Sequence, residues 1–116
     1  MNALLVLNDP PYGTERSYNG LRLALALVRA DDTRVQVFLL GDAVACGKAG
    51  QKTPDGYHNV SRMLSGLISS GAEVRACSCC LDARGIADAE LVIGVERSAM
   101  AALAEWTTAA DRVLVF

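Results

Sequence analysis

The sequence predicts an α/β fold, a three-layer α/β/α sandwich around a mainly parallel sheet of about five strands. Short apolar runs alternate along the chain with segments whose apolar residues recur at the spacing of a helix face. Clusters of Gly, Pro, Asn and Asp separate these segments and mark turns. A length of 116 residues is sufficient for one hydrophobic core, so we expect residues 1–116 to form a single domain.

The first expected strand is residues 3–7, a continuous apolar run that stops at Asn8. Such a run is typical of a strand buried on both faces of a parallel sheet. Thr14 can then cap a helix that continues through about Arg29, since the apolar residues of this segment lie on one helical stripe.

The next expected strand is residues 35–40, which are apolar apart from Gln36, and it ends at Gly41. Residues 43–55 contain two glycines and a proline, so we expect a loop with one helical turn at the end of the sheet. A clearly amphipathic helix begins at about Asn59 and closes at Gly71.

The third strand, residues 73–76, runs directly into a group of cysteines. A short turn or helix is expected to follow, up to Gly85. Residues 91–93 are apolar and predict a fourth strand. A helix over 98–110, capped by its first residue, and a terminal strand over 112–116 complete the fold.

Composition and charge exclude several classes of protein. Thirteen acidic and 11 basic residues are scattered without a basic run, so nucleic acid is not expected as the principal ligand. No stretch is long enough to span a membrane, and Met1 to Asn8 lacks the basic start of a signal peptide. We therefore expect a cytoplasmic protein with reduced cysteines. Because 52% of so short a chain is hydrophobic, we also expect a homo-oligomer.

Three of the four cysteines lie within four positions, directly after the third expected strand. Sites in parallel sheets gather beyond the carboxyl ends of strands. Cys77 leaves the strand where a short helix can start, and Arg84 can return its guanidinium towards it. Both features favour the reactive thiolate. Cys80 lies three residues later, a spacing that permits a disulfide, transfer of sulfur between thiols, or two ligands of a zinc ion.

Other residues could belong to such a site, but each also has an ordinary structural explanation. Only Cys46 and His58 remain to complete a closed zinc site, which makes zinc the weaker alternative. Cys46 is interpreted as a core residue. His58 could serve as an acid or base, although a lone histidine in a polar loop is commonly exposed to solvent. Cys79 has no assigned role.

Several stretches spread over nearly the whole chain also carry a family resemblance. In order they are residues 8–13, 21–24, 38–44, 50–52, 56–57, Cys77 and Cys80 followed by 82–86, 103–107 and 111–114. Together they resemble the DsrE/DsrF-like family, and in particular its small YchN-like branch. The resemblance implies a DsrEFH-like three-layer α/β/α fold and assembly into trimeric or hexameric rings.

The resemblance also implies a role in sulfur relay. In the better-understood branches, a cysteine in the loop after the third strand accepts sulfane sulfur as a persulfide and passes it on. By its position eight residues before Gly85, that cysteine corresponds to Cys77, and Cys80 matches the second cysteine of the YchN-like branch. No cofactor or metal is implied, and the partner would be a protein that donates or accepts sulfur.

Three hypotheses about function therefore stay open. The first is a sulfurtransferase or sulfur carrier that uses Cys77, Cys80 and Arg84. The second is a non-catalytic, ring-forming binding protein in which the cysteines are incidental. The third is a thiol-disulfide redox module that uses Cys77 and Cys80, although Gly85 closes the segment earlier than in the usual thioredoxin motif.

Overall fold

A computed structural model describes residues 1–116 and contains one sheet of five parallel strands. The strand order across the sheet is β4-β3-β2-β1-β5, with every neighbouring pair parallel. The strands are β1 (Asn2–Leu7), β2 (Arg34–Leu39), β3 (Glu73–Cys77), β4 (Val95–Ser98) and β5 (Arg112–Val115).

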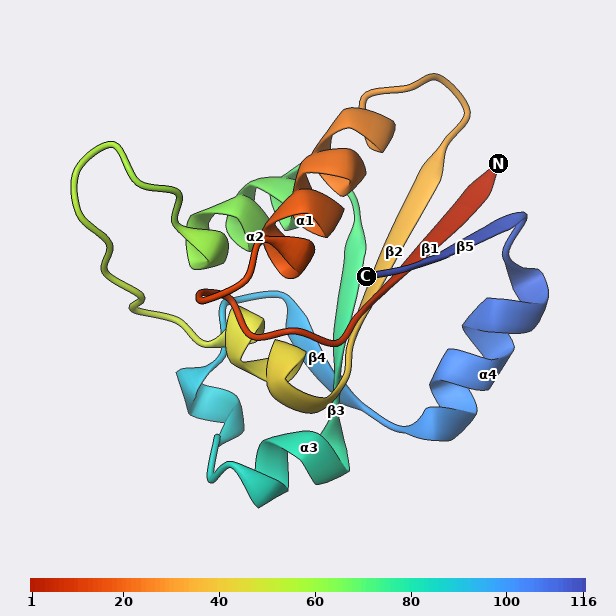
Figure 1. The fold of residues 1–116 in the computed structure, drawn as a ribbon. Helices are drawn as coiled ribbons and strands as arrows, with labels where there is room; N and C mark the ends of the chain where they lie inside the picture. Colours follow the sequence, from red (N-terminus) through yellow and green to blue (C-terminus); the bar gives the residue numbers. More distant parts are fainter.

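Helices cover both faces of this sheet. Figure 1 shows α1 and α2 on one face, α4 on the other, and α3 beyond the end of β3. The three-layer α/β/α prediction is therefore confirmed. None of the helices has the length and apolarity needed to cross a bilayer. The helices are α1 (Arg16–Leu27), α2 (Val60–Ser69), α3 (Ser78–Ala83) and α4 (Met100–Ala109), with short 3-10 helices η1 (Gly41–Gly47) and η2 (Asp88–Glu90).

The core lies on both sides of the central strands β1 and β2. Leu4, Leu5 and Leu7 of β1 are fully buried, and each such side chain stabilises the fold by about 1.5–3 kcal/mol relative to an exposed one. On the α4 face, Trp106 meets Phe38 edge to face with the ring centroids 6.0 Å apart. Trp106, expected to be either a core residue or a subunit contact, is thus 7% exposed and part of the core.

The amino-terminal end of α2 agrees with the sequence prediction, whereas those of α1 and α4 differ from it. The helix expected to begin at about Asn59 is α2, and Asn59 is its N-cap, because its side-chain oxygen accepts a hydrogen bond from the amide of Arg62. The expectation that Thr14 caps α1 is wrong: its hydroxyl donates to Asp9, and the N-cap is the next residue, Glu15, which makes no side-chain capping hydrogen bond. Ser98 does not cap α4 either, since it is the last residue of β4.

The predicted fourth strand at residues 91–93 is also wrong, because β4 begins at Val95. Leu91 makes only an isolated antiparallel bridge, and the amide of Val92 donates to the carbonyl of Gly47. The side chains of these two apolar residues are buried against the η1 region instead of extending the sheet. Gly94 then turns the chain with a φ of +100°, and the sheet resumes with four half-buried or exposed residues.

The parallel arrangement places the carboxyl ends of all five strands at one edge of the sheet. At that edge β2 continues into η1 and β3 continues into α3. The β2–β3 register pairs Leu39 with Ala76, so the segments that begin at Leu40 and Cys77 leave the sheet side by side. This adjacency brings the thiols that follow β3 next to the backbone that follows β2.

Candidate functional site

The thiols of Cys77 and Cys80 lie in contact at the carboxyl edge of the sheet. Cys77 is the last residue of β3 and is 8% exposed, whereas Cys80 lies in α3 and is half-buried. A hydrogen bond between the Cys80 thiol and the Cys77 sulfur raises the pKa of Cys80, and burial raises that pKa further. The protonated form of Cys80 is therefore favoured while the two thiols lie together.

A backbone amide from the neighbouring connection also reaches this pair. The amide of Gly41, the first residue of η1, donates to Cys80 Sγ at 3.2 Å. This hydrogen bond acts on the pKa of Cys80 in the opposite direction to the Cys77 contact, because it favours a charged sulfur. At six residues α3 is short, so this amide is a more specific source of stabilisation than a helix dipole.

Arg84 ends α3 but does not extend its guanidinium onto Cys77. Its Nη2 lies 2.7 Å from Oδ1 of Asp42, and its Nη1 donates to the carbonyl of Cys80 at 3.0 Å. Its positive charge still lowers the pKa of Cys80, as the smallest of the causes that act there. Arg84 thus lies near the second thiol and connects α3 with η1.

The other two cysteines have separate environments. Cys79 is exposed on α3. Cys46 is fully buried in η1, where burial raises the pKa of its thiol to about 12. At neutral pH Cys46 is therefore a neutral core residue, in agreement with its interpretation from the sequence. His, Cys, Asp and Glu side chains nowhere form a group of three or more that could hold a metal ion.

His58 contacts aromatic rings. Its ring stacks with the rings of Tyr18 and Tyr57, with centroid separations of 3.9 and 4.3 Å. Its Nε2 atom is buried and has no hydrogen-bond partner. The expectation of an exposed loop histidine is therefore wrong, and the geometry gives His58 a packing role.

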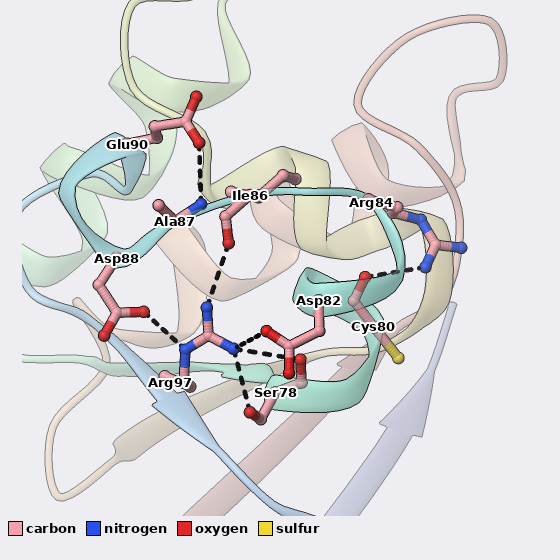
Figure 2. A network of polar contacts seen from close by, with 9 residues as sticks. All are labelled: Ser78, Cys80, Asp82, Arg84, Ile86, Ala87, Asp88, Glu90 and Arg97. Carbon is pink, nitrogen blue, oxygen red and sulfur yellow. Dashed lines mark hydrogen bonds and ion pairs between the residues drawn. The ribbon is translucent and has the colours of Figure 1, made fainter.

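Arg97 of β4 is a residue that the sequence patterns missed. Figure 2 shows its guanidinium between α3 and the segment that returns from α3 to the sheet. It donates to the side chains of Asp82 and Asp88 at 2.8 and 2.6 Å, and to Ser78 and Ile86. The only signal in the sequence is an arginine inside a short polar strand, and this gives no indication of the residues it contacts.

The arrangement suits chemistry on sulfur. One thiol is held at the end of a strand that has neighbours on both sides, and a second thiol touches it and receives a backbone hydrogen bond. Two thiols in contact can exchange a sulfur atom or form a disulfide without a large movement of the chain. Because the Cys77 side chain is only 8% exposed, a reaction partner must come into close contact with the carboxyl edge of the sheet to reach its sulfur.

Comparison with known proteins places this site in a family context. The model of the DsrE/DsrF-like family matches residues 1–116. The protein YchN from Escherichia coli K12 is 42% identical over 114 residues, which cover 97% of each chain. An uncharacterised protein of Methanopyrus kandleri is also 42% identical, over 97% of this chain and 91% of its own. The crystal structure of YchN from E. coli matches with a TM-score of 0.91 and 40% identity over 100% of both chains.

Proposed function

Because the chain belongs to the DsrE/DsrF-like family, we propose that it carries sulfane sulfur as a persulfide on Cys77. The observation that supports this proposal is the contact between the thiols of Cys77 and Cys80 at the carboxyl edge of the sheet. A thiol that accepts and later releases a sulfur atom benefits from a second thiol within reach, because that thiol can take the sulfur over.

The loading step is a thiol exchange. The Cys77 thiolate attacks the outer sulfur of a donor persulfide, R–S–SH. A bond forms between Cys77 Sγ and that sulfur while the S–S bond of the donor breaks, and its electron pair leaves with the inner sulfur as R–S⁻. The donor thiolate takes a proton from water, and Cys77–S–SH remains. No oxidant or reductant is consumed, because the sulfane sulfur only moves from one thiol to another.

Cys80 and Arg84 have supporting roles in this proposal. In the resting state Cys80 is the neighbouring thiol of Cys77, and the hydrogen bond between them raises the pKa of Cys80. After loading, the Cys80 thiolate can attack the outer sulfur of Cys77–S–SH, or a partner protein can do so, and Cys77 leaves as a thiolate. Arg84 holds the second thiol through the carbonyl of Cys80. The chemistry needs reduced thiols, which are typical of the cytoplasm.

Mass spectrometry of one peptide tests the proposal. Trypsin cleavage after Arg75 and Arg84 releases residues 76–84, which hold Cys77, Cys79 and Cys80 together. After incubation with inorganic polysulfide, we expect this peptide to gain the mass of one sulfur, located on Cys77. Cys77→Ser is expected to abolish the gain with the fold intact, whereas the matched control Cys79→Ser keeps it. Full loading of Cys77→Ser would contradict the proposal.

The same contact between thiols favours a second candidate, a thiol-disulfide redox module. Oxidised glutathione would convert Cys77 and Cys80 into a disulfide and would itself be reduced to two thiols. For this candidate, peptide 76–84 would lose two hydrogens reversibly during a glutathione titration and would gain no sulfur from polysulfide. These two mass changes separate the candidates on a single sample.

We further propose that the chain assembles into a homo-oligomeric ring, either a trimer or a hexamer. Supporting this, three apolar side chains lie largely exposed: Ile93, Met100 and Val115, at 95%, 61% and 67%. Native mass spectrometry distinguishes trimer, hexamer and monomer directly. A ring that assembles but takes up no sulfur would indicate the non-catalytic binding protein instead.

A further inference from the structure

We infer that Arg97 is a positioning residue that keeps Cys80 in contact with Cys77, by fixing α3 and the segment that returns from it to the sheet. The consequence of this inference for sulfur transfer rests on the proposed function. Its geometric part concerns only the two thiols. Arg97 touches neither sulfur atom, so any effect on them must pass through the backbone that it holds.

The contacts on α3 reach both ends of that helix. Arg97 Nη1 donates to the carbonyl and the hydroxyl of Ser78 at 3.2 and 3.0 Å, and to Oδ1 of Asp82 at 2.8 Å. Ser78 directly follows Cys77, and Asp82 lies in the turn after Cys80. One nitrogen therefore fixes α3 on either side of the second thiol.

The remaining contacts of Arg97 fix the segment that returns from α3 to the sheet. Arg97 Nη2 donates to the carbonyl of Ile86 at 3.1 Å, and Nε donates to Oδ1 of Asp88 at 2.6 Å. Figure 2 shows all these partners around a single guanidinium. Only the planar, five-hydrogen group of arginine can serve acceptors in so many directions at once, because the lysine ammonium is a compact point charge.

The base of the Arg97 side chain is itself fixed relative to Cys77. In the β3–β4 register Arg97 pairs with Ala76, and the next pair is Cys77 with Ser98. The guanidinium thus connects the strand beside Cys77 with the helix that carries Cys80. The hydrogen bonds that Arg97 donates, first to Asp88 and then to Asp82, raise its pKa, so Arg97 stays cationic and its charge is balanced by two carboxylates.

These contacts differ from those of the other arginine near the site. Arg84 reaches the carbonyl of Cys80 and Asp42 of η1, and its charge acts on Cys80 directly. Arg97 donates no hydrogen bond to a thiol, and it is not among the groups that shift the pKa of Cys80. Its influence is expected through position, and this separates the two arginines experimentally.

The decisive variant is Arg97→Lys, studied together with Arg97→Gln in a Cys79→Ser background. Iodoacetamide alkylation of Cys80, followed on peptide 76–84 across a pH series, reports the Cys80–Cys77 hydrogen bond. If α3 loosens, that hydrogen bond weakens and the alkylation midpoint of Cys80 moves to lower pH, towards the ordinary value of a free thiol. We also expect polysulfide loading of Cys77 to fall about tenfold, because small displacements near a reacting centre are costly.

Arg34→Gln is the matched control, because it removes an ion pair with Glu73 at the amino-terminal end of the strands, away from the thiols. It should leave both readouts unchanged. Arg97→Lys keeps the charge, so a midpoint shift in that variant comes from lost geometry. A shift confined to Arg97→Gln would indicate a role of charge and would overturn the inference.

The inference can still be tested if Arg97→Lys does not fold or if the wild-type protein takes up no sulfur. If Arg97→Lys fails to fold, Asp82→Ala and Asp88→Ala each remove one contact of Arg97 and should move the alkylation midpoint of Cys80 to lower pH by smaller amounts. Unchanged midpoints in both would overturn the inference. If the wild-type protein takes up no sulfur, the proposed function fails, and the alkylation midpoint alone still decides whether Arg97 positions Cys80.

Discussion

Arg84 and Asp42 form an ion pair, with Nη2 of the arginine 2.7 Å from Oδ1 of the aspartate, that joins the end of α3 to the start of η1. Asp42 directly follows Gly41, whose amide donates to Cys80 Sγ, and Arg84 also donates to the carbonyl of Cys80. The pair therefore holds both ends of the hydrogen bond between η1 and the second thiol. Because Asp42 is 65% exposed, its main effect is on geometry rather than on stability.

Arg84→Gln should move the alkylation midpoint of Cys80 to higher pH. The guanidinium lowers the pKa of Cys80 by its charge, and loss of the ion pair also weakens the Gly41 hydrogen bond, which acts in the same direction. This shift is opposite in sign to the one expected for Arg97→Lys. Iodoacetamide alkylation on peptide 76–84 measures both, and a shift to lower pH in Arg84→Gln would contradict this assignment.

The stability of the protein should decline at alkaline pH because of Cys46. Burial raises the pKa of this thiol from 9.0 to about 12, so the folded state keeps a proton that the unfolded state releases. The contribution is fully present below pH 9 and is lost as pH rises towards 12; by pH 10.5 the loss is about 2 kcal/mol.

Urea unfolding of wild type and Cys46→Ala at pH 8 and pH 10.5 measures this loss of stability. The variant is less stable at pH 8, because a fully buried side chain is shortened. Its free energy of unfolding should, however, fall less between the two pH values than that of the wild type. Equal declines in both proteins would show that Cys46 is not the group responsible.

Gly94→Ala should destabilise the fold more than Gly71→Ala. Both glycines have a φ near +100°, which costs about 1–2 kcal/mol for alanine. A Cβ at position 94 would also lie 2.7 Å from Cγ2 of Ile68, whereas a Cβ at position 71 would meet no atom within 4 Å. The contact adds about 1–3 kcal/mol by overpacking. Chemical denaturation gives the difference, and equal losses would contradict the close approach of Ile68.

Trp106→Ala should cost about 3–5 kcal/mol of stability, since the ring is 7% exposed and packs against Phe38. The guanidinium of Arg75, 4.4 Å from the centre of the ring, loses its aromatic partner in the same variant. Glu105→Ala, on the same helix but exposed, is the matched control and should change the free energy of unfolding by less than about 0.5 kcal/mol. A loss of stability in Glu105→Ala comparable to that in Trp106→Ala would show that packing of the Trp106 ring is not what holds α4.

The sequence is informative wherever an element is buried on more than one side. Residues 3–7 are all apolar, and residues 35–40 are apolar apart from Gln36, because β1 and β2 have neighbouring strands on both edges and helices on both faces. The edge strand β4 has no such requirement, and its polar residues gave no strand signal. Leu91 and Val92, the apolar residues just before β4, are buried because they pack against η1. Their apolar character led to the incorrect prediction of a strand at residues 91–93.

The candidate site is predictable to a similar extent. Cysteines that directly follow a strand must lie at the edge of the sheet, so the position of Cys77 follows from local sequence. The positions of the arginine side chains do not, because they depend on partners distant in the chain. Arg84 meets Asp42 across 42 residues, and the contacts of Arg97 lie 9 to 19 residues before it. No local periodicity encodes such contacts.

The two thiols are held by different kinds of force. Cys77 is fixed by the hydrogen bonds of a strand between two parallel neighbours, whereas α3, apart from the buried Leu81, is held largely by arginines paired with exposed carboxylates. Surface charge pairs weaken as dissolved ions accumulate, since the screening length falls to about 8 Å at physiological ionic strength. The position of the Cys80 thiol is therefore expected to depend on the salt concentration, whereas the position of the Cys77 thiol is not.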